Sequence, residues 1–188
     1  AGSLALENNV ASINAFIVQK LIDANFHIAG KANLSEWANF RSEDSVSDWS
    51  SYGGQTRHFL NTEYNPCGSS SGSAVAVAIG VVDIAIGTET NGSISCPSSV
   101  NGIVGFKPTV GLVSRSGIVP ISGSQDTAGP MGKSVELVAK TLEVIAGYDP
   151  LDPATNDIPD NLDLNFSKDL ESSSISGKRF AILQSDSS

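Results

Sequence analysis

The stretch Cys67-Gly-Ser-Ser-Ser-Gly-Ser-Ala-Val-Ala-Val-Ala-Ile79 decides the fold of this chain. Its second half consists of small apolar residues, which suit a helix that is packed closely on all sides. The segments that follow predict a buried strand at Val81–Ile86, a tight turn at Gly87–Ser93 and a further strand at Ile103–Phe106. Strands that alternate with helices in this way predict an α/β sheet.

Apolar spacing predicts further elements on both sides of this stretch. Ser12–Ala24 and Ser134–Ala146 each repeat apolar residues at helical spacing, and each begins with a serine that suits a helix cap. Gly147 ends the second of these helices. Phe26–Ala29 predicts a short strand, and Lys31–Phe40 predicts a short helix that leads into a polar loop.

The composition divides the chain into three regions. Residues 1–148 are the predicted core of one domain. Residues 149–176 are a predicted acidic, proline-containing linker, in which seven acidic side chains and one basic side chain are solvated. Residues 177–188 are predicted to begin the next strand of the same domain, at Phe180–Leu183. The chain starts Ala1-Gly-Ser without methionine and stops before that strand can pair, so we expect a domain that is incomplete at both ends.

The charge balance argues against several classes of partner. The 188 residues contain 11 Lys and Arg and 20 Asp and Glu, which gives a net charge of −9. Binding to nucleic acid or to an anionic membrane needs clustered cationic side chains, so we expect neither partner. No apolar run approaches the roughly 20 residues that span a bilayer, and the N-terminus lacks the pattern of a signal peptide. We therefore expect a soluble protein.

The cysteines and histidines limit the metal and redox chemistry. Cys67 and Cys96 are too few for a disulfide framework, and with only His27 and His58 available their spacing matches no zinc motif. We expect reduced thiols, which favours a cytoplasmic protein. We expect neither a metal nor an organic cofactor.

The turn Gly87–Ser93 has the most specific chemistry. It places the Ser93 hydroxyl after a predicted strand, in a turn whose glycines permit unusual dihedral angles and expose backbone N–H groups. Such a turn can hold a nucleophile together with an oxyanion hole, which acyl transfer requires. An ordinary loop is the alternative for this turn taken alone.

The Gly68–Ser73 block is a second candidate site. It precedes a helix and resembles an anion cradle, since unpaired N–H groups gather at a helix start. It lacks the lysine of a nucleotide-binding P-loop, and a flexible serine linker is a further alternative. The two serine turns meet if both lie on the same edge of the sheet.

A serine nucleophile needs a base that removes its proton. His27 lies at a predicted apolar strand and His58 in a polar loop, so neither sits in a catalytic motif. Lys31, Lys107 and Lys133 each follow a turn, and a desolvated lysine can serve as a base. A structural or solvated role is the simpler interpretation of each lysine.

Several segments together are specific enough to indicate a family. They are C-G-S-S-S-G-S-A-V-A-V-A at 67–78, G-T-E-T-N-G-S-I-S-C-P-S-S-V-N-G-I-V-G-F-K-P-T-V-G-L-V-S-R-S-G at 87–117, G-K-A-N-L-S-E-W-A-N-F-R-S at 30–42 and Q-D-T-A-G-P-M at 125–131. Over roughly residues 1–153 the chain resembles the amidase signature family. The resemblance implies a three-layer α/β/α fold around a mixed sheet, and hydrolysis of amides by a triad of serine, cis-serine and lysine.

The resemblance also implies roles for individual residues. Ser93 matches the nucleophile of the family, and Ser69 matches the bridging serine, which follows a cis peptide bond. The oxyanion hole would use the backbone N–H groups of Thr90, Asn91 and Gly92. Because Asn91 stands where glycine is usual, we expect the turn to tolerate a side chain there.

The third member of the family triad is the neutral lysine that draws the nucleophile's proton through the bridging serine. In the family this lysine belongs to a K-D-N-like segment upstream of an A-G-S-L-like stretch, and the present sequence starts at that stretch. Lys31 belongs to a separate family segment and does not replace it. The resemblance therefore implies an amidase whose base lies outside these residues.

The expected function is hydrolysis of a small-molecule carboxylic amide through an acyl-Ser93 intermediate. An alternative within the family is a glutamyl-tRNA amidotransferase A subunit, which uses glutamine as ammonia donor and needs partner subunits. The E-T-N-G-S-I-S-C-P turn and the W-A-N-F-R-S segment look more like the stand-alone amidases. An alternative of another class is a catalytically silent α/β module, since the 188 residues lack the family lysine.

Overall fold

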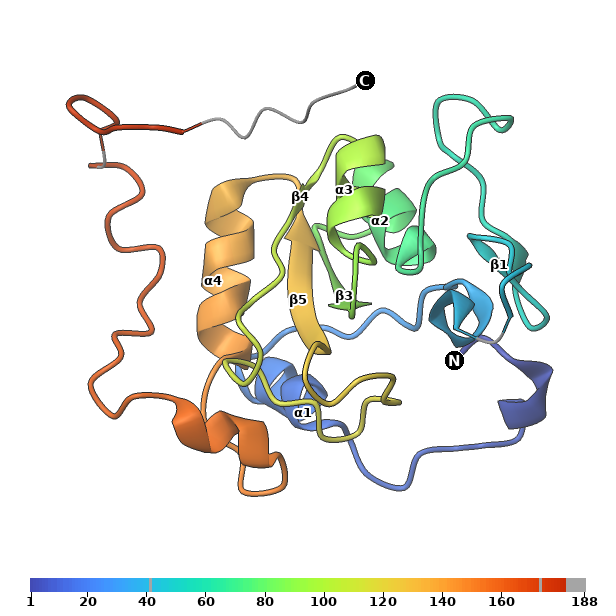
Figure 1. The fold of residues 1–188 in the computed structure, drawn as a ribbon, viewed down its shortest axis with the longest axis horizontal. Coiled ribbons are helices and arrows are strands. Elements are labelled where there is room, and N and C mark those ends of the chain that lie inside the picture. The colour runs from blue at the N-terminus through green and yellow to red at the C-terminus, as the bar shows by residue number, and fades with distance from the viewer. Residues whose placement is uncertain (41, 173, 182–188) are drawn as a thin grey trace.

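A three-stranded sheet forms the centre of the molecule (Figure 1). The computed structural model describes residues 1–40, 42–172 and 174–181. The sheet contains β3 (Ile84–Glu89), β5 (Thr127–Gly132) and β4 (Val104–Gly105) in the order β3-β5-β4, and both neighbouring pairs are antiparallel. The predicted strand at 180–183, with the region 177–188, lies partly outside the described residues, and its described part is not in a strand.

Helices and short turns surround this sheet (Figure 1). The α-helices are α1 (Phe16–Asp23), α2 (Ser71–Ala78), α3 (Ser95–Val100) and α4 (Val135–Ile145). The short elements are the 3-10 turns η1 (Leu4–Leu6), η2 (Glu36–Asn39) and η3 (Pro153–Asp157) and the antiparallel ribbon of β1 (Trp49–Ser50) and β2 (Gly54–Gln55).

The two faces of the sheet carry separate apolar clusters, because alternate residues of a strand point to opposite faces. Ala128 of β5 lies in the cluster that α1 and α4 cover, with Ile17, Leu21, Val113, Leu142 and Ile145. Met131 points to the other face and packs with Ala74 of α2 and with Ile94, just before α3. Helices therefore cover the sheet on both sides, and the predicted α/β/α layering is confirmed.

The predicted helices at α2 and α4 are confirmed, and the predictions before them need correction. Ser134 caps α4 by accepting a hydrogen bond from the Leu137 N–H at 3.2 Å. By contrast, α1 begins at Phe16, not at residue 12, and no side chain caps it. No strand forms at 26–29, because no strand of the described sheets pairs with it. In the predicted helix 31–40 only the turn η2 forms, because three of its residues have left-handed φ angles of 51°, 54° and 65°.

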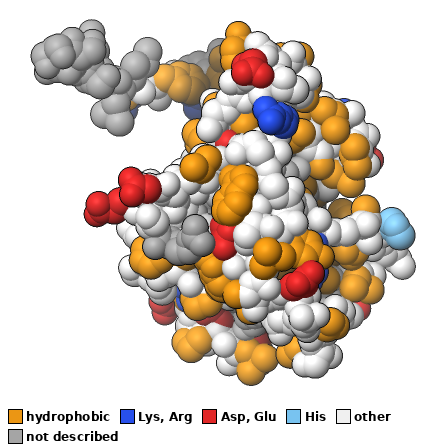
Figure 2. Space-filling model, turned by 90° about the vertical axis from the view of Figure 1, so that its right-hand side faces the viewer, with side chains coloured by type: hydrophobic (Ala, Val, Ile, Leu, Met, Phe, Trp, Pro, Cys, Tyr) orange, Lys and Arg blue, Asp and Glu red, His pale blue; other side chains and the backbone are white. Residues whose placement is uncertain are grey.

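Several large apolar side chains remain in contact with solvent. Figure 2 views the molecule from the right-hand side of Figure 1 and shows such side chains in separate patches on that face. Between residues 40 and 64 the exposed large apolar side chains are Phe40, Val46, Trp49, Tyr52, Phe59, Leu60 and Tyr64. Within the described ranges, no helix combines the length and the apolar character that a membrane crossing requires.

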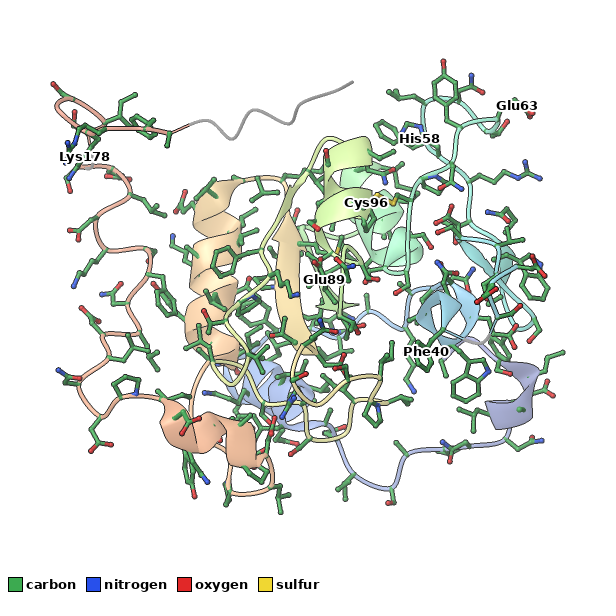
Figure 3. All side chains as sticks on the ribbon, viewed as in Figure 1. Phe40, His58, Glu63, Glu89, Cys96 and Lys178 are labelled. Carbon is green, nitrogen blue, oxygen red and sulfur yellow. A yellow bond between two sulfur atoms is a disulfide. The ribbon has the colours of Figure 1, made fainter. Side chains whose placement is uncertain are left out.

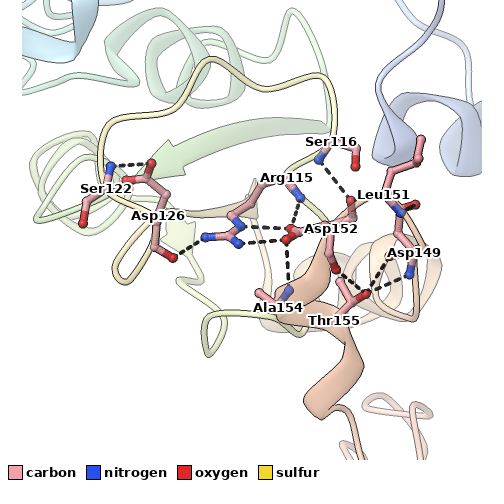
Figure 4. A network of polar contacts seen from close by, with 11 residues as sticks. Arg115, Ser116, Ser122, Asp126, Asp149, Leu151, Asp152, Ala154 and Thr155 are labelled. Carbon is pink, nitrogen blue, oxygen red and sulfur yellow. Dashed lines mark hydrogen bonds and ion pairs between the residues drawn. The ribbon is translucent and has the colours of Figure 1, made fainter.

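The first two acids of the predicted linker are buried and paired, so solvation does not explain them. Asp149 and Asp152 are 2% and 4% exposed. The Arg115 guanidinium donates through Nε and Nη2 to the two carboxylate oxygens of Asp152, at 2.9 and 2.8 Å (Figure 4). The Ser114 hydroxyl donates to Asp149 at 2.5 Å. These contacts hold the segment after α4 against the residues that precede β5. The domain boundaries themselves stay a prediction.

Replacing Asp152 by Asn tests this contact. The Arg115 guanidinium lowers the pKa of Asp152 from 3.8 to about 2, despite the opposing effect of burial. A lowered folded-state pKa adds stability above the unfolded-state value and loses it as pH falls toward the folded-state value. We expect Asp152→Asn to lower the free energy of unfolding by roughly 2 kcal/mol at pH 7, and by about half as much at pH 3. Denaturant titration at both pH values measures the difference.

The matched control for this experiment is Asp157→Asn, an exposed acid of the adjoining turn η3. It removes the same charge without breaking a buried pair, and we expect a change of less than about 0.5 kcal/mol. Equal effects of the two variants at pH 7 would show that the Arg115 contact does not stabilise the fold.

Candidate active site

The serine block at the start of α2 is bound to the backbone of β3. Ser70 Oγ accepts a hydrogen bond from the Thr88 N–H at 3.1 Å and donates to the Thr88 carbonyl at 3.2 Å. One turn later, Ser73 Oγ donates to the Ile86 carbonyl at 2.9 Å. These bonds exclude a flexible serine linker, because both hydroxyls belong to the packed contact between helix and strand.

The same contact brings the two serine turns together. The Ser70 N–H donates to the Ser93 carbonyl at 3.2 Å. The close approach needs a glycine in β3, since a Cβ on Gly87 would lie 3.0 Å from Ser70 Oγ and 2.7 Å from Met131 Sδ. The expectation that both serine turns lie at one edge of the sheet is confirmed.

A disulfide forms a second connection between these turns, and it corrects the prediction of reduced thiols. Cys67 and Cys96 are bonded to each other, with their Cα atoms 5.9 Å apart. Cys67 precedes the serine block and Cys96 lies in the first turn of α3, just after Ser93. Their positions 29 residues apart gave no sign of this pairing. The cysteines therefore no longer favour a cytoplasmic location.

Ser69 occupies a buried position within the serine block. The Gly68–Ser69 peptide bond is cis, as the family resemblance implies. Ser69 is 1% exposed, and its carbonyl accepts a hydrogen bond from the Ser35 N–H at 3.0 Å. Its Oγ is buried and has no hydrogen-bond partner among residues 1–40, 42–172 and 174–181. The hydroxyl is therefore available to a further donor or acceptor.

Glu89, the last residue of β3, orders the turn that carries Ser93. Its carboxylate accepts the N–H groups of Gly92, Ile94 and Ser95 at 2.8, 2.7 and 2.8 Å. Burial by itself would raise the pKa of Glu89, but these donors hold the pKa below its ordinary value. Figure 3 places Glu89 near the middle of the molecule, close to α3. The carboxylate is ionised at neutral pH and braces both sides of Ser93.

The three residues before Ser93 differ in backbone conformation, exposure and hydrogen bonding. Gly92 has a φ of 87°, which favours glycine, and its N–H already donates to Glu89. Asn91 is exposed and does not have a positive φ, so the turn tolerates its side chain as expected. Thr90 is held from two sides: its hydroxyl donates to Asp126 at 2.5 Å, and its carbonyl accepts Lys107 Nζ at 2.8 Å.

The histidines and lysines of the chain do not reach the two serines. His58 is buried and contacts the Val100 carbonyl at 3.2 Å through Nε2, and His27 is exposed. Lys107 Nζ donates to the Thr90 carbonyl at 2.8 Å and lies 3.9 Å from a carboxylate oxygen of Glu89, and Lys31 and Lys133 are exposed. Within the described ranges no hydrogen bond joins any of these side chains to either serine. The described residues therefore offer two hydroxyls and a braced turn without a base.

A cavity of about 310 Å³ opens beside this turn. Thr88, Glu89 and Thr90 form its wall at the end of β3, and Asp126 lies beside them. The apolar side chains of Ile118, Val119 and Ile121 contribute to its lining. The cavity can hold a small molecule against Thr88, Glu89 and Thr90, and its lining combines polar and apolar side chains but includes neither Ser69 nor Ser93.

Comparison with known proteins agrees with this geometry. A family model described as amidase matches residues 1–188. The chain is 44% identical to a probable amidase of Arabidopsis thaliana, over all of this chain and 37% of the relative. It is also 44% identical to a glutamyl-tRNA(Gln) amidotransferase A subunit of Pseudothermotoga lettingae, over 96% of this chain and 37% of the relative.

Solved structures give the same result. A peptide amidase from Stenotrophomonas maltophilia superposes with a TM-score of 0.83 at 58% identity, over 86% of this chain and 33% of that one. The present chain thus spans about a third of the length of the relatives that it matches. The match over the whole sequence, together with the fold, shows that the chain belongs to the amidase family.

Proposed function

We propose that the whole protein hydrolyses the C–N bond of carboxylic amides through an acyl intermediate on Ser93. The observation that carries this proposal is the hydrogen bond from the Ser70 N–H to the Ser93 carbonyl, which joins the two serine turns. It supports a relay in which the buried hydroxyl of Ser69 serves the nucleophile. Glu89, which braces the turn on both sides of Ser93, supports a preorganised site.

The proposed reaction moves one proton out and back. Ser93 Oγ attacks the amide carbon while its proton passes to Ser69 Oγ, and the Ser69 proton passes to a basic amine. The same path returns a proton to the leaving amine as the C–N bond breaks, and water then hydrolyses the acyl ester. The N–H groups of Thr90, Asn91 and Gly92 are the proposed oxyanion hole, in which Gly92 is shared with Glu89. The base is a lysine outside these 188 residues.

The proposed substrates are small-molecule amides, including amides of peptides. The likeness to a peptide amidase at 58% identity supports this class. The cavity beside Thr90 supports it as well, since its apolar lining residues suit a carbon side chain and its polar lining residues suit an amide.

Replacing each serine tests the relay in the whole protein. We expect Ser93→Ala to abolish labelling by a fluorophosphonate probe and to lower kcat by at least about a thousandfold. We expect Ser69→Ala to lower kcat by roughly a hundredfold or more with little change in KM, because a proton relay acts on the chemical step. Turnover of a peptide amide and mass spectrometry of the labelled protein measure these effects.

Ser99→Ala is the matched control, since Ser99 is an exposed serine of the same helix as Cys96. We expect it to behave like the wild type in both measurements. A whole protein that turns over no amide and is not labelled at Ser93 would contradict the proposal and favour a catalytically silent module.

Release of ammonia from glutamine is the second candidate activity, because a glutamyl-tRNA(Gln) amidotransferase A subunit of Symbiobacterium thermophilum matches at 47% identity. We expect the purified whole protein to hydrolyse a peptide amide with no other polypeptide added, as a stand-alone amidase does. Glutaminase activity that appears only with partner subunits would reverse the assignment. Ammonia release measured with each substrate, with and without those partners, decides between the two.

Glu89→Gln tests the hydrogen bonds by which Glu89 orders the turn that carries Ser93. The substitution keeps the size of the side chain but replaces one acceptor oxygen by an NH₂ group, which cannot accept an N–H bond. We expect kcat to fall by roughly tenfold to a hundredfold, since hydrogen bonds to a charged group are among the stronger ones. Glu63→Gln, at an exposed acid of the 57–66 loop, is the control and should leave kcat unchanged (Figure 3). Equal kcat values for Glu89→Gln and the wild type would show that the hydrogen bonds of Glu89 do not contribute to catalysis.

A further inference from the structure

Asp48 carries a buried carboxylate without a partner. The residue is 0% exposed, and neither carboxylate oxygen has a hydrogen-bond donor among the described residues. Burial raises the pKa of Asp48 to about 6. An unpaired charge in such a place is strongly unfavourable unless a cation or several donors compensate it.

Asp48 lies against the segment that carries Ser69. A Cβ on Gly68 would lie 2.3 Å from Ser35 Oγ, 3.0 Å from Ser47 Oγ and 3.1 Å from Asp48 Oδ1. Ser35 joins the two segments, because its N–H donates to the Ser69 carbonyl at 3.0 Å and its Oγ accepts the Asp48 N–H at 2.8 Å. The carboxylate thus borders the Gly68–Ser69 peptide bond.

The Asp48 carboxylate and the Ser69 hydroxyl, in two segments that Ser35 joins, both lack a hydrogen-bond partner among the described residues, as does the Ser71 hydroxyl of the same serine block. A carboxylate only accepts hydrogen bonds, whereas a hydroxyl both donates and accepts. An amine satisfies both groups: it accepts the Ser69 proton when neutral and donates to the carboxylate when protonated. Glu36, which follows Ser35 in the chain, has the wrong sign of charge, and its carboxylate accepts the Ser51 N–H at 2.9 Å.

We propose that Asp48 is a positioning residue of the proton relay, whose carboxylate is the counter-ion of the amine that takes the proton from Ser69. This proposal rests on the proposed function, and the amine belongs to a part of the whole protein outside these 188 residues. When Ser93 attacks, its proton moves to Ser69 and the Ser69 proton moves to the amine. The ammonium so formed faces Asp48, which stays ionised until the proton returns.

The backbone at Asp48 allows clean test variants. Its φ is 72°, in the left-handed region that asparagine and glycine adopt more readily than other residues. Asp48→Asn removes the charge at nearly constant size. Asp48→Gly removes the whole side chain, and it is measured instead if the first variant does not fold. Asp44→Asn removes an exposed acid of the same loop and is the control.

The first measurement is the pH profile of kcat/KM of the whole protein. A carboxylate beside the amine stabilises its ammonium form and so raises the pH at which the free base appears. We expect Asp48→Asn and Asp48→Gly to move the acid limb of the profile to lower pH by about one unit or more, and Asp44→Asn to leave it in place. An acid limb that stays at the wild-type pH in both Asp48 variants would overturn the proposal.

The second measurement is the melting temperature of the whole protein at pH 8, which does not depend on activity. Removing an ionised carboxylate that has no partner raises the melting temperature, whereas removing one member of a buried pair lowers it. We expect Asp48→Asn to lower it by roughly 4 °C or more, and a rise would overturn the proposal. A wild-type protein that hydrolyses no amide overturns the proposed function, and the melting temperature alone then decides whether Asp48 has a cationic partner.

Discussion

The hydroxyl of Ser70 is the contact on which the rest of the candidate site depends. It both accepts from and donates to the backbone of Thr88, and so holds the start of α2 against the end of β3. Its own N–H then remains for the Ser93 carbonyl. Gly87 makes the approach possible, because a side chain there would collide with Ser70. If helix and strand moved apart, the two serine turns would separate, and the turn that Glu89 orders would lose its contact with the serine block.

Expectations from the sequence succeed where the pattern is local and repeated. The helix α2 follows from its run of small apolar residues, the helix α4 from apolar spacing and the cap at Ser134, and the layering from the alternation of helices and strands. The prediction of a strand at 26–29 is wrong, because a strand forms only where a second strand pairs with its backbone, and the residues of 26–29 do not specify that partner. The prediction that Asp149 and Asp152 are solvated is wrong for the same reason, because their partners Ser114 and Arg115 lie more than thirty positions away in the sequence.

The residues of the candidate site also divide into those that a local motif indicates and those whose surroundings form only in the fold. Ser69 and Ser93 stand out in the sequence because both lie in short motifs, and the fold places these motifs side by side. Their catalytic roles, and those of Thr90, Asn91 and Gly92, stay predictions. Glu89 stands within the turn motif, yet its function depends on the N–H groups that the folded turn presents to it. Asp48 gives no local signal at all, because its environment is assembled from segments that meet only in the fold.

The disulfide between Cys67 and Cys96 closes a loop that contains the serine block, α2, β3 and the turn that carries Ser93. A cross-link over 29 positions restricts the unfolded chain and is worth roughly 3 to 4 kcal/mol in the chain-entropy account. Ser69 and Ser93 therefore stay within one covalent ring even when the chain loses its folded contacts. A chain that refolds in its oxidised form starts with both serines already near each other, and a single cut inside the ring leaves the two halves of the site tethered.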